Sequence, residues 1–435
     1  MSSMPMSTRL FRMIRGSGRN DPMNKSMRMI NFSWVSVVSA ILITLMGIYS
    51  IDVSEHLRSD GSTALAAVAS KQVVFLIIGM IACVLIALPH YRIVGHFSVV
   101  LFALCIGLLV FLLIPGVPSW LVRPRNGARA WINLRLMDFQ PSELTKIGFV
   151  LVIAWYMRYR SHHRKMKGLI VPGIIAAVPV ALITVQPDLG TASLFVPALF
   201  AMLIAAGAKL KHLMLIVVLA GMAAPAAYPF MKPHQKQRIV AMVKQYQGDD
   251  STSFDINYQS DRAQTLIGAG MATGMNDDAA RAVVHYNQLP EAHNDMIFAV
   301  VVARFGFFGG MAVLALYGLW VGGALCVAAS CREPLGRLIA VGLAAFIMAQ
   351  VVVNIGMNLG LVPIIGITLP FMSYGGSSLL TCWLMTGLIV NVALHRPRPP
   401  YRNSFEFDDE GDPDLMQPTR AYGRQIGFSG RALTR

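Results

Sequence analysis

Three titratable side chains, Glu291, His293 and Asp295, stand at the head of a long apolar stretch, "LPEAHNDMIFAVVVARFGFFGG" (residues 289–310). A carboxylate beside groups that bind a diphosphate can act as a general base and take the proton of a sugar hydroxyl. A carboxylate at a helix N-terminus can also be a purely structural acid, because the helix dipole favours negative charge there. The pattern leaves both interpretations of Asp295 open.

Three more motifs place polar side chains inside or at the edge of apolar stretches. "QPSELTK" carries Glu143 and Lys146, which are three residues apart and share one helix face. They fit an ion pair as well as a substrate contact. "QPDLG" places Asp188 in a tight turn, where it could face a substrate or cap the next helix. "LPFMSYGGSS" breaks the chain and puts Ser373 and Tyr374 at the mouth of the following segment. Charges at membrane depth are costly, so such groups usually face a cavity.

The elements that must position these residues belong to a membrane protein. Of the 435 residues, 55% are hydrophobic and 14% are charged, whereas soluble domains are about a quarter charged. Backbone groups in lipid need internal hydrogen bonds, so each span must be helical. The sequence therefore predicts an all-α polytopic membrane protein. Its ten transmembrane helices are expected at about 31–51, 71–90, 96–115, 143–158, 169–186, 189–207, 212–230, 295–329, 336–357 and 373–394.

The distribution of lysine and arginine orients these segments. Basic residues cluster before the first segment and after the fourth, sixth, eighth and tenth. Basic loops stay on the cytoplasmic side, so both termini are predicted to be cytoplasmic. Long extracytoplasmic loops then fall at about 116–142 and, between helices 7 and 8, at about 231–294. The net charge of +15 is read as topology and contact with anionic lipids, with no nucleic-acid partner.

The first outer loop carries four arginines against that trend: Arg123, Arg125, Arg129 and Arg135. Short translocated loops seldom hold so many. The guanidinium fork matches phosphate oxygens, which favours binding of a phosphate or diphosphate headgroup. The alternative is nonspecific pairing with lipid phosphates at the membrane surface.

The segment 295–329 is too long for a simple span. At 1.5 Å per residue it would measure about 52 Å, against a hydrocarbon core of about 30 Å. Its first part must tilt, lie at the outer surface or bend. Gly306, Gly309 and Gly310 provide the flexibility for a bend.

The rest of the chain carries fewer signals. A basic N-terminal arm (1–30) precedes the ten-helix domain (31–395), and a tail (396–435) rich in proline, glycine and charge is predicted to be disordered and cytoplasmic. No cleavable signal peptide is expected. The five cysteines show no CxxC spacing, so neither a disulfide nor a metal site is predicted.

Four motifs, in order, resemble the SEDS family of membrane glycosyltransferases (RodA, FtsW and SpoVE), which polymerise peptidoglycan from lipid II. The resemblance covers about 30–395, and ten spans is the family's architecture. The stretch "VNIGMNLGLVPIIGITLPF" looks closer to the elongation branch, RodA, than to the division branch. The matching motifs are "GARAWINLRLMDFQPSELTK" (127–146), "QPDLGTA" (186–192), "LPEAHNDMIFAV" (289–300) and "GITLPFMSYGGSS" (366–378).

The resemblance implies a lipid II polymerase of cell-wall elongation and shape maintenance in the bacterial inner membrane, with an extracytoplasmic active site. Its substrates would be lipid II and a polyprenyl-linked glycan, and its partner a class B penicillin-binding protein. A divalent cation such as Mg²⁺ could assist at the diphosphate, although no ligand cluster demands one. Asp295 corresponds to the catalytic base, and the candidates for substrate binding are Arg129, Glu143, Lys146, Asp188, Glu291, His293, Ser373 and Tyr374.

This sequence also departs from the family pattern. The family commonly has threonine where Asn294 stands, an acidic pair where Ala303 and Arg304 stand, and a lysine where Met275 stands. These changes could alter rate, loop order or partner contact. Three alternatives stay open: a division-type paralogue, a lipid II flippase and a noncatalytic scaffold.

Overall fold

The computed structural model describes residues 22–55, 65–115, 117–118, 120–122, 129–135, 137–160, 165–227, 229, 236, 240 and 258–395. One compact unit comprises Met1–Pro397, and a second comprises Arg398–Arg435. The second unit, and with it most of the tail predicted to be disordered, lies outside the described residues.

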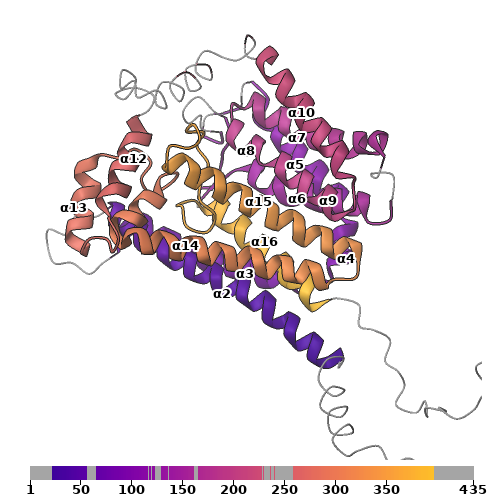
Figure 1. Cartoon of the computed structure of the whole chain (residues 1–435), viewed down its shortest axis with the longest axis horizontal. Helices are drawn as coiled ribbons and strands as arrows, with labels where there is room; N and C mark the ends of the chain where they lie inside the picture. Colours follow the sequence, from indigo (N-terminus) through magenta and orange to yellow (C-terminus); the bar gives the residue numbers. More distant parts are fainter. Residues whose placement is uncertain are drawn as a thin grey trace, which may run out of the picture. The chain divides into compact units, whose positions relative to one another are not determined.

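A helix covers each of the ten apolar segments (Figure 1). Short helical turns precede three of them: α4 (Tyr91–His96), the 3-10 helix Met166–Leu169 and α8 (Leu189–Ser193). The main helices are α2 (Pro22–Glu55), α3 (Ala67–Ala87), α5 (Ser98–Leu113), α6 (Pro141–Met157), α7 (Ile170–Val185), α9 (Phe195–Ala205), α10 (Leu210–Ala227), α14 (Ile297–Ser330), α15 (Pro334–Asn358) and α16 (Gly376–Leu394).

Six stretches within the described residues are long and apolar enough to cross a membrane: Phe32–Glu55, Ala67–Ala87, Met166–Val185, Ile297–Ser330, Pro334–Asn358 and Gly376–Leu394. Shorter apolar helices cover Ser98–Leu113, Leu189–Ala205 and Leu210–Leu219. The prediction of a helical, multi-pass membrane protein is therefore confirmed. The count of ten spans and their orientation stay predictions.

Helices that are far apart in the sequence pack together in one bundle. Helix α14 packs against α2 and α15, and α16 packs against α3. At the centre of another contact, the rings of Phe149, Phe195 and Phe346 meet edge to face with centroids 5.2–6.0 Å apart, which joins α6, α9 and α15. Such edge-to-face contacts add about 0.5–1.5 kcal/mol per pair to the burial of the rings.

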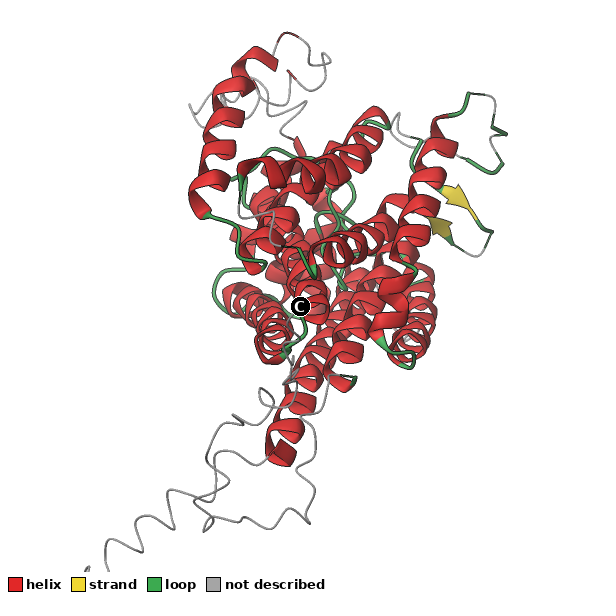
Figure 2. Ribbon diagram, turned by 90° about the vertical axis from the view of Figure 1, so that its right-hand side faces the viewer, coloured by secondary structure: helices red, strands yellow, loops and turns green. Residues whose placement is uncertain are grey.

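The two long loops, about 116–142 and 231–294, contain short elements that the sequence pattern did not predict. In the first, β1 (Ile132–Asn133) and β2 (Asp138–Phe139) form an antiparallel hairpin at one side of the helices (Figure 2). In the second, α12 (Tyr258–Ala269) and α13 (Asp277–Asn287) pack against α14, and α13 also packs against α2 (Figure 1).

Helix α14 bends where the sequence predicted flexibility. Gly306 has φ 70° and ψ −169°, so two helices meet there rather than one continuous helix. The stretch after the break, 306–330, measures about 37 Å at 1.5 Å per residue, which is enough to span a membrane alone. The stretch before the break is Ile297–Phe305, and Asp295 lies just before its first residue.

Candidate active site

Asp295 lies in a turn that two asparagines of α15 hold by its backbone. The side-chain amides of Asn354 and Asn358 donate hydrogen bonds to the Asp295 carbonyl oxygen, at 2.8 and 3.1 Å. Both asparagines are fully buried. The Asp295 carboxylate itself accepts no hydrogen bond from another described residue. Its backbone is thus fixed while its carboxylate stays available.

The N-terminus of α14 is capped by another residue. The N-cap position is Met296, which makes no side-chain cap. The Asn358 side-chain oxygen instead accepts a hydrogen bond from the Ala299 amide, at 3.3 Å. Asp295 therefore does not serve as the hydrogen-bonding cap of this helix, which was the structural alternative closest to the sequence pattern.

The electrostatics of Asp295 are set by burial and by two other acids. Burial, together with the negative charges of Glu291 and Asp188, raises the pKa of Asp295 from 3.8 to about 7. A carboxyl group with a pKa near the working pH is suited to general acid–base chemistry.

Asp188 takes the capping role, one of the two roles that the sequence left open for it, and its contact with a substrate stays a prediction. One of its carboxylate oxygens accepts the Thr191 amide at 3.0 Å and caps α8, and the other accepts the Gln140 side-chain amide at 3.1 Å. Burial raises the pKa of Asp188, and the nearby charge of Glu143 raises it too. The structure thus brings Asp188 electrostatically close to both Asp295 and Glu143.

Glu143 and Lys146 form the ion pair that their spacing predicted. The Lys146 ammonium lies 2.7 Å from a Glu143 carboxylate oxygen and donates to the Gln350 side-chain oxygen at 3.0 Å. Both charged side chains are at most 5% exposed. The second Glu143 oxygen has no hydrogen-bond partner among the described residues. A buried pair of this kind neutralises its own charge, and it leaves one acceptor open.

Three amides of α15 form a ladder that the sequence analysis missed. Gln350, Asn354 and Asn358 are spaced by four residues, so they lie on one helix face, and all three are buried. Gln350 donates to the Thr368 carbonyl oxygen at 2.8 Å, and Asn354 donates to that of Ile367 at 2.6 Å. The ladder therefore ties Lys146, the Asp295 turn and the 367–368 backbone to one helix. Three amides at this spacing in an apolar segment were a usable signal.

The turn before Asp295 is also hydrogen-bonded to the 369–374 turn. The Ser373 hydroxyl donates to the Asn294 carbonyl oxygen at 2.6 Å, and the Tyr374 amide donates to that of His293 at 2.9 Å. The rings of His293 and Tyr374 are 5.8 Å apart, edge to face. His293 pairs with Glu55 of α2 at 2.8 Å. Ser373, Tyr374 and His293 thus come together with the Asp295 turn, through contacts within the protein.

Two candidates stand at the surface. Glu291 has φ 56° and accepts a hydrogen bond from the Asn294 side chain at 2.5 Å. Arg129 lies just before β1 with an exposed side chain, and no hydrogen bond or ion pair joins it to the acids among the residues described. Arg123 and Arg125 lie outside the described residues.

No group of three or more histidine, cysteine, aspartate or glutamate side chains gathers as a metal site within the described ranges. The partly buried acids Asp188 and Asp295 are coupled by charge, but the described residues provide no donor set that specifies an ion. No step below is therefore routed through a metal.

Comparison with known proteins identifies the class. The model of the FtsW/RodA/SpoVE family, described as cell cycle proteins, matches residues 31–398. The chain is 33% identical to stage V sporulation protein E of Bacillus subtilis over 332 residues, which covers 75% of this chain and 86% of that protein. It is 30% identical to the peptidoglycan glycosyltransferase MrdB of Escherichia coli K12 over 324 residues, which covers 73% of this chain and 83% of MrdB. The chain belongs to this family.

A solved structure supports the same conclusion for the fold. The chain resembles a protein from a study titled "Structural coordination of polymerization and crosslinking by a peptidoglycan synthase complex", with a TM-score of 0.70 and 28% identity. The match covers 84% of this chain and 98% of the other. Further relatives are named as probable FtsW peptidoglycan glycosyltransferases. The resemblance to SEDS enzymes is thus confirmed, whereas the three branch names among the relatives leave the RodA subtype a prediction.

Proposed function

We propose that this protein polymerises lipid II into glycan strands and releases polyprenyl diphosphate. The observation that carries the proposal is Asp295, a partly buried carboxylate without a hydrogen-bond donor among the described residues, whose pKa is raised to about 7 and whose backbone is fixed by two buried amides. Relatives named peptidoglycan glycosyltransferases supply the reaction class.

In the proposed reaction, Asp295 acts as the general base. A carboxylate oxygen of Asp295 takes the proton of the acceptor sugar's 4-hydroxyl, and the 4-oxygen of that sugar forms a bond to the anomeric carbon of the donor glycan. The bond from this carbon to the diphosphate breaks, and the electron pair leaves with the polyprenyl diphosphate. Because the nucleophile enters opposite the leaving group, the anomeric configuration inverts. Positioning of the two sugars would supply much of the rate enhancement.

The other candidates take supporting roles in the proposal. Arg129 is exposed on the first outer loop, where its guanidinium can meet a diphosphate and stabilise its developing charge. Glu143 and Lys146 form a buried polar pair whose charge lies near Asp188, and in the proposal they face the lipid headgroup. Asp188 keeps the pKa of Asp295 high through its negative charge.

The cellular setting follows from the family. We place the protein in the bacterial inner membrane with both termini in the cytoplasm and Asp295 on the outer side. Its partner would be a class B penicillin-binding protein, because a structural neighbour comes from a complex that couples polymerization to crosslinking. The elongation role of RodA is preferred over division because of the stretch before "LPF", although relatives of all three branches match.

The proposal is tested by polymerisation of purified lipid II with the wild type and with Asp295→Asn. Asparagine preserves the shape but cannot take the proton, so the rate should fall by about 10²–10⁴-fold while the melting temperature does not fall. The matched control is Asp278→Asn, an exposed aspartate in the first turn of α13. If Asp295→Asn builds long strands at a near-normal rate, the base assignment is wrong. Translocation of lipid II without polymer by the wild type would favour the flippase instead.

A further inference from the structure

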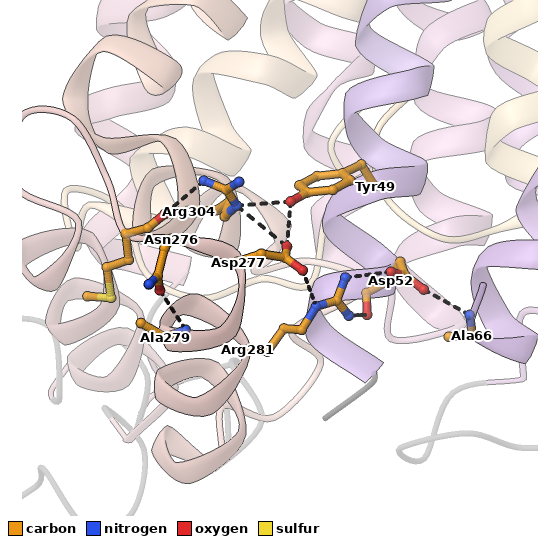
Figure 3. Close-up of polar contacts among 9 residues, drawn as sticks. Tyr49, Asp52, Ala66, Asn276, Asp277, Ala279, Arg281 and Arg304 are labelled. Atoms are coloured by element: carbon orange, nitrogen blue, oxygen red, sulfur yellow. Dashed lines mark hydrogen bonds and ion pairs between the residues drawn. The ribbon is translucent and has the colours of Figure 1, made fainter. Parts of the chain in front are cut away.

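Five side chains form a polar cluster where α2, α13 and α14 meet (Figure 3). They come from three elements: Tyr49 and Asp52 from α2, Asp277 and Arg281 from α13, and Arg304 from α14. The Arg281 guanidinium lies 2.6 Å from Asp52 and 2.9 Å from Asp277, and it is almost fully buried. The cluster therefore fastens α13 to α2.

Arg304 extends the cluster to α14. Its guanidinium donates to the Tyr49 hydroxyl at 2.9 Å and to the Met275 carbonyl oxygen at 2.7 Å. It also lies 3.6 Å from an oxygen of Asp277, the same oxygen that accepts the Tyr49 hydroxyl at 2.5 Å (Figure 3). One side chain thus joins α2, α13 and the loop that precedes α13.

That loop, 270–276, docks into the break of α14. The break at Gly306 leaves backbone amides without helical partners, and the amides of Phe307 and Phe308 donate instead to carbonyl oxygens of the loop, at 2.8 and 3.2 Å. A third hydrogen bond runs the other way, from the Met275 amide to the helix before the break, at 3.3 Å. The loop therefore replaces the missing turn of helix.

Three glycines permit this docking. A Cβ atom on Gly270, Gly274 or Gly306 would lie 2.0, 2.2 or 2.4 Å from a backbone oxygen of the facing segment, which no side chain can tolerate. Gly274 and Gly306 also have positive φ values, 82° and 70°, which favour glycine. The close approach of the loop to the helix break thus requires glycine at these three positions.

The docked loop sets the position of the helix that follows Asp295. Ile297–Phe305 measures about 13 Å, with Asp295 just before one end and Arg304 at the other. Seven consecutive residues, 297–303, are buried on all sides. A segment held this tightly moves as one body, so a shift at Arg304 is carried to Asp295.

The contact between Arg304 and the loop is made to the loop's backbone. The Arg304 guanidinium donates to the Met275 carbonyl oxygen, while its other partners, Tyr49 and Asp277, lie on α2 and α13. A lysine at 275 facing an acid at 304 could connect the same loop to the same helix with the charges reversed.

We infer that Arg304, paired with Asp277 and Tyr49, docks the 270–276 loop and thereby positions Asp295. The second half of this inference rests on the proposed function. Arg304 is a positioning residue, because it touches the loop and not the reacting atoms.

The test reverses the charges of the contact between Arg304 and the 270–276 loop. Arg304→Glu alone places an acid beside Asp277, so the loop should undock. The triple variant Met275→Lys, Asp277→Asn, Arg304→Glu restores a lysine–acid pair without a change in net charge. Arg304→Gln is the milder single variant, and Arg262→Glu in α12 is the control, since it reverses an arginine of the same region whose described contacts, Tyr258 and Asn287, lie away from the break.

Two readouts are measured on the full-length protein in lipid nanodiscs. The first is hydrogen exchange at the Phe307 and Phe308 amides, which reports docking directly. The second is lipid II polymerisation, separated into kcat and KM. Arg304→Glu should speed exchange and lower kcat about tenfold with KM unchanged, in the range of coupling between contacting residues. The triple variant should return both to within about threefold of the wild type.

Each outcome decides a part of the inference. If Arg304→Glu and Arg304→Gln leave exchange and kcat unchanged, or if Arg262→Glu is equally damaging, the docking role is wrong. If a folded triple variant recovers neither readout, the charge contact at Arg304 is not what docks the loop. If the hydrogen-exchange data follow expectation while the wild type makes no polymer, the docking role of Arg304 stands. The proposed function, and with it the positioning of Asp295, is then wrong.

Discussion

Asp295 and Glu333 are acids at the starts of successive helices, at opposite ends of α14, and their surroundings differ. Glu333 precedes α15 and accepts hydrogen bonds from Arg92, at 3.0 Å to each oxygen, and from the Tyr91 hydroxyl. Burial alone would raise the pKa of Glu333, but these donors outweigh it and lower the pKa. Asp295 is partly buried without such donors among the described residues, and its pKa is raised to about 7.

The difference separates a structural acid from a candidate catalytic one. A carboxylate that must hold helices together is given cations and hydroxyl donors, and its charge is stabilised. A carboxylate that must take a proton has to remain a poor acid, which requires burial and neighbouring negative charge. At Asp295, burial and the charges of Glu291 and Asp188 raise the pKa. Asn354 and Asn358 hydrogen-bond only to its backbone and so do not stabilise the charge of its carboxylate.

The largest effect after loss of Asp295 itself is expected at its support. Asn354→Leu removes hydrogen bonds to the Asp295 and Ile367 carbonyl oxygens while keeping the side-chain volume. The Asp295 turn should shift, and a misplacement of about 1 Å can cost about 10²-fold in rate. Lipid II polymerisation should show this loss with KM nearly unchanged. The control is Asn287→Leu in α13, which removes a hydrogen-bonded amide elsewhere. Equal activity of Asn354→Leu and the wild type would show that the ladder is not a support for the site.

The comparison of the two acids also predicts opposite pH dependences. The folded-state pKa of Asp295 is raised from 3.8 to about 7, so its contribution to stability is present at low pH and is lost as pH rises through about 7. The pKa of Glu333 is lowered from 4.5, so its contribution is present at neutral pH and is lost as pH falls through the folded pKa. If Asp295 is the base, kcat should rise with pH up to about 7 and then level off.

These dependences can be measured on one preparation. Single-turnover polymerisation between about pH 5.5 and 8.5 gives the kinetic pKa, and melting curves across the same range and below it give the stability. Asp295→Asn should remove the loss of stability toward pH 7, and Glu333→Gln should remove the acid-side loss. A rate that is flat across pH 7 in the wild type would contradict the assignment of Asp295 as the base.

The sequence predicted the parts of this arrangement that depend on local pattern. The apolar segments are helical, α14 bends at Gly306, and Glu143 and Lys146, three residues apart, form an ion pair. It could not predict contacts that depend on packing between distant helices. The amides of α15 looked like polar interruptions of an apolar run, because their partners are the backbones of other turns. Arg304 looked like a lost acid until its contact with Met275, 29 residues earlier, was visible.

The smallest effect is expected at the structural acid. Glu333→Gln leaves Tyr91 and Arg92 without their charged acceptor, but the Arg92 side chain is 55% exposed and can return to water. The loss should therefore be about 1 kcal/mol, well below the 3–5 kcal/mol of a fully buried broken pair. A melting temperature a few degrees lower in detergent, with the polymerisation rate per folded molecule unchanged, would fit this view. The companion variant Arg92→Gln should lower the melting temperature by a similar amount, because it breaks the same pair from the exposed side. If either variant reduced the rate as strongly as a change at Asp295, the division between a structural and a catalytic end of α14 would be wrong, and the two ends would have to be coupled through that helix.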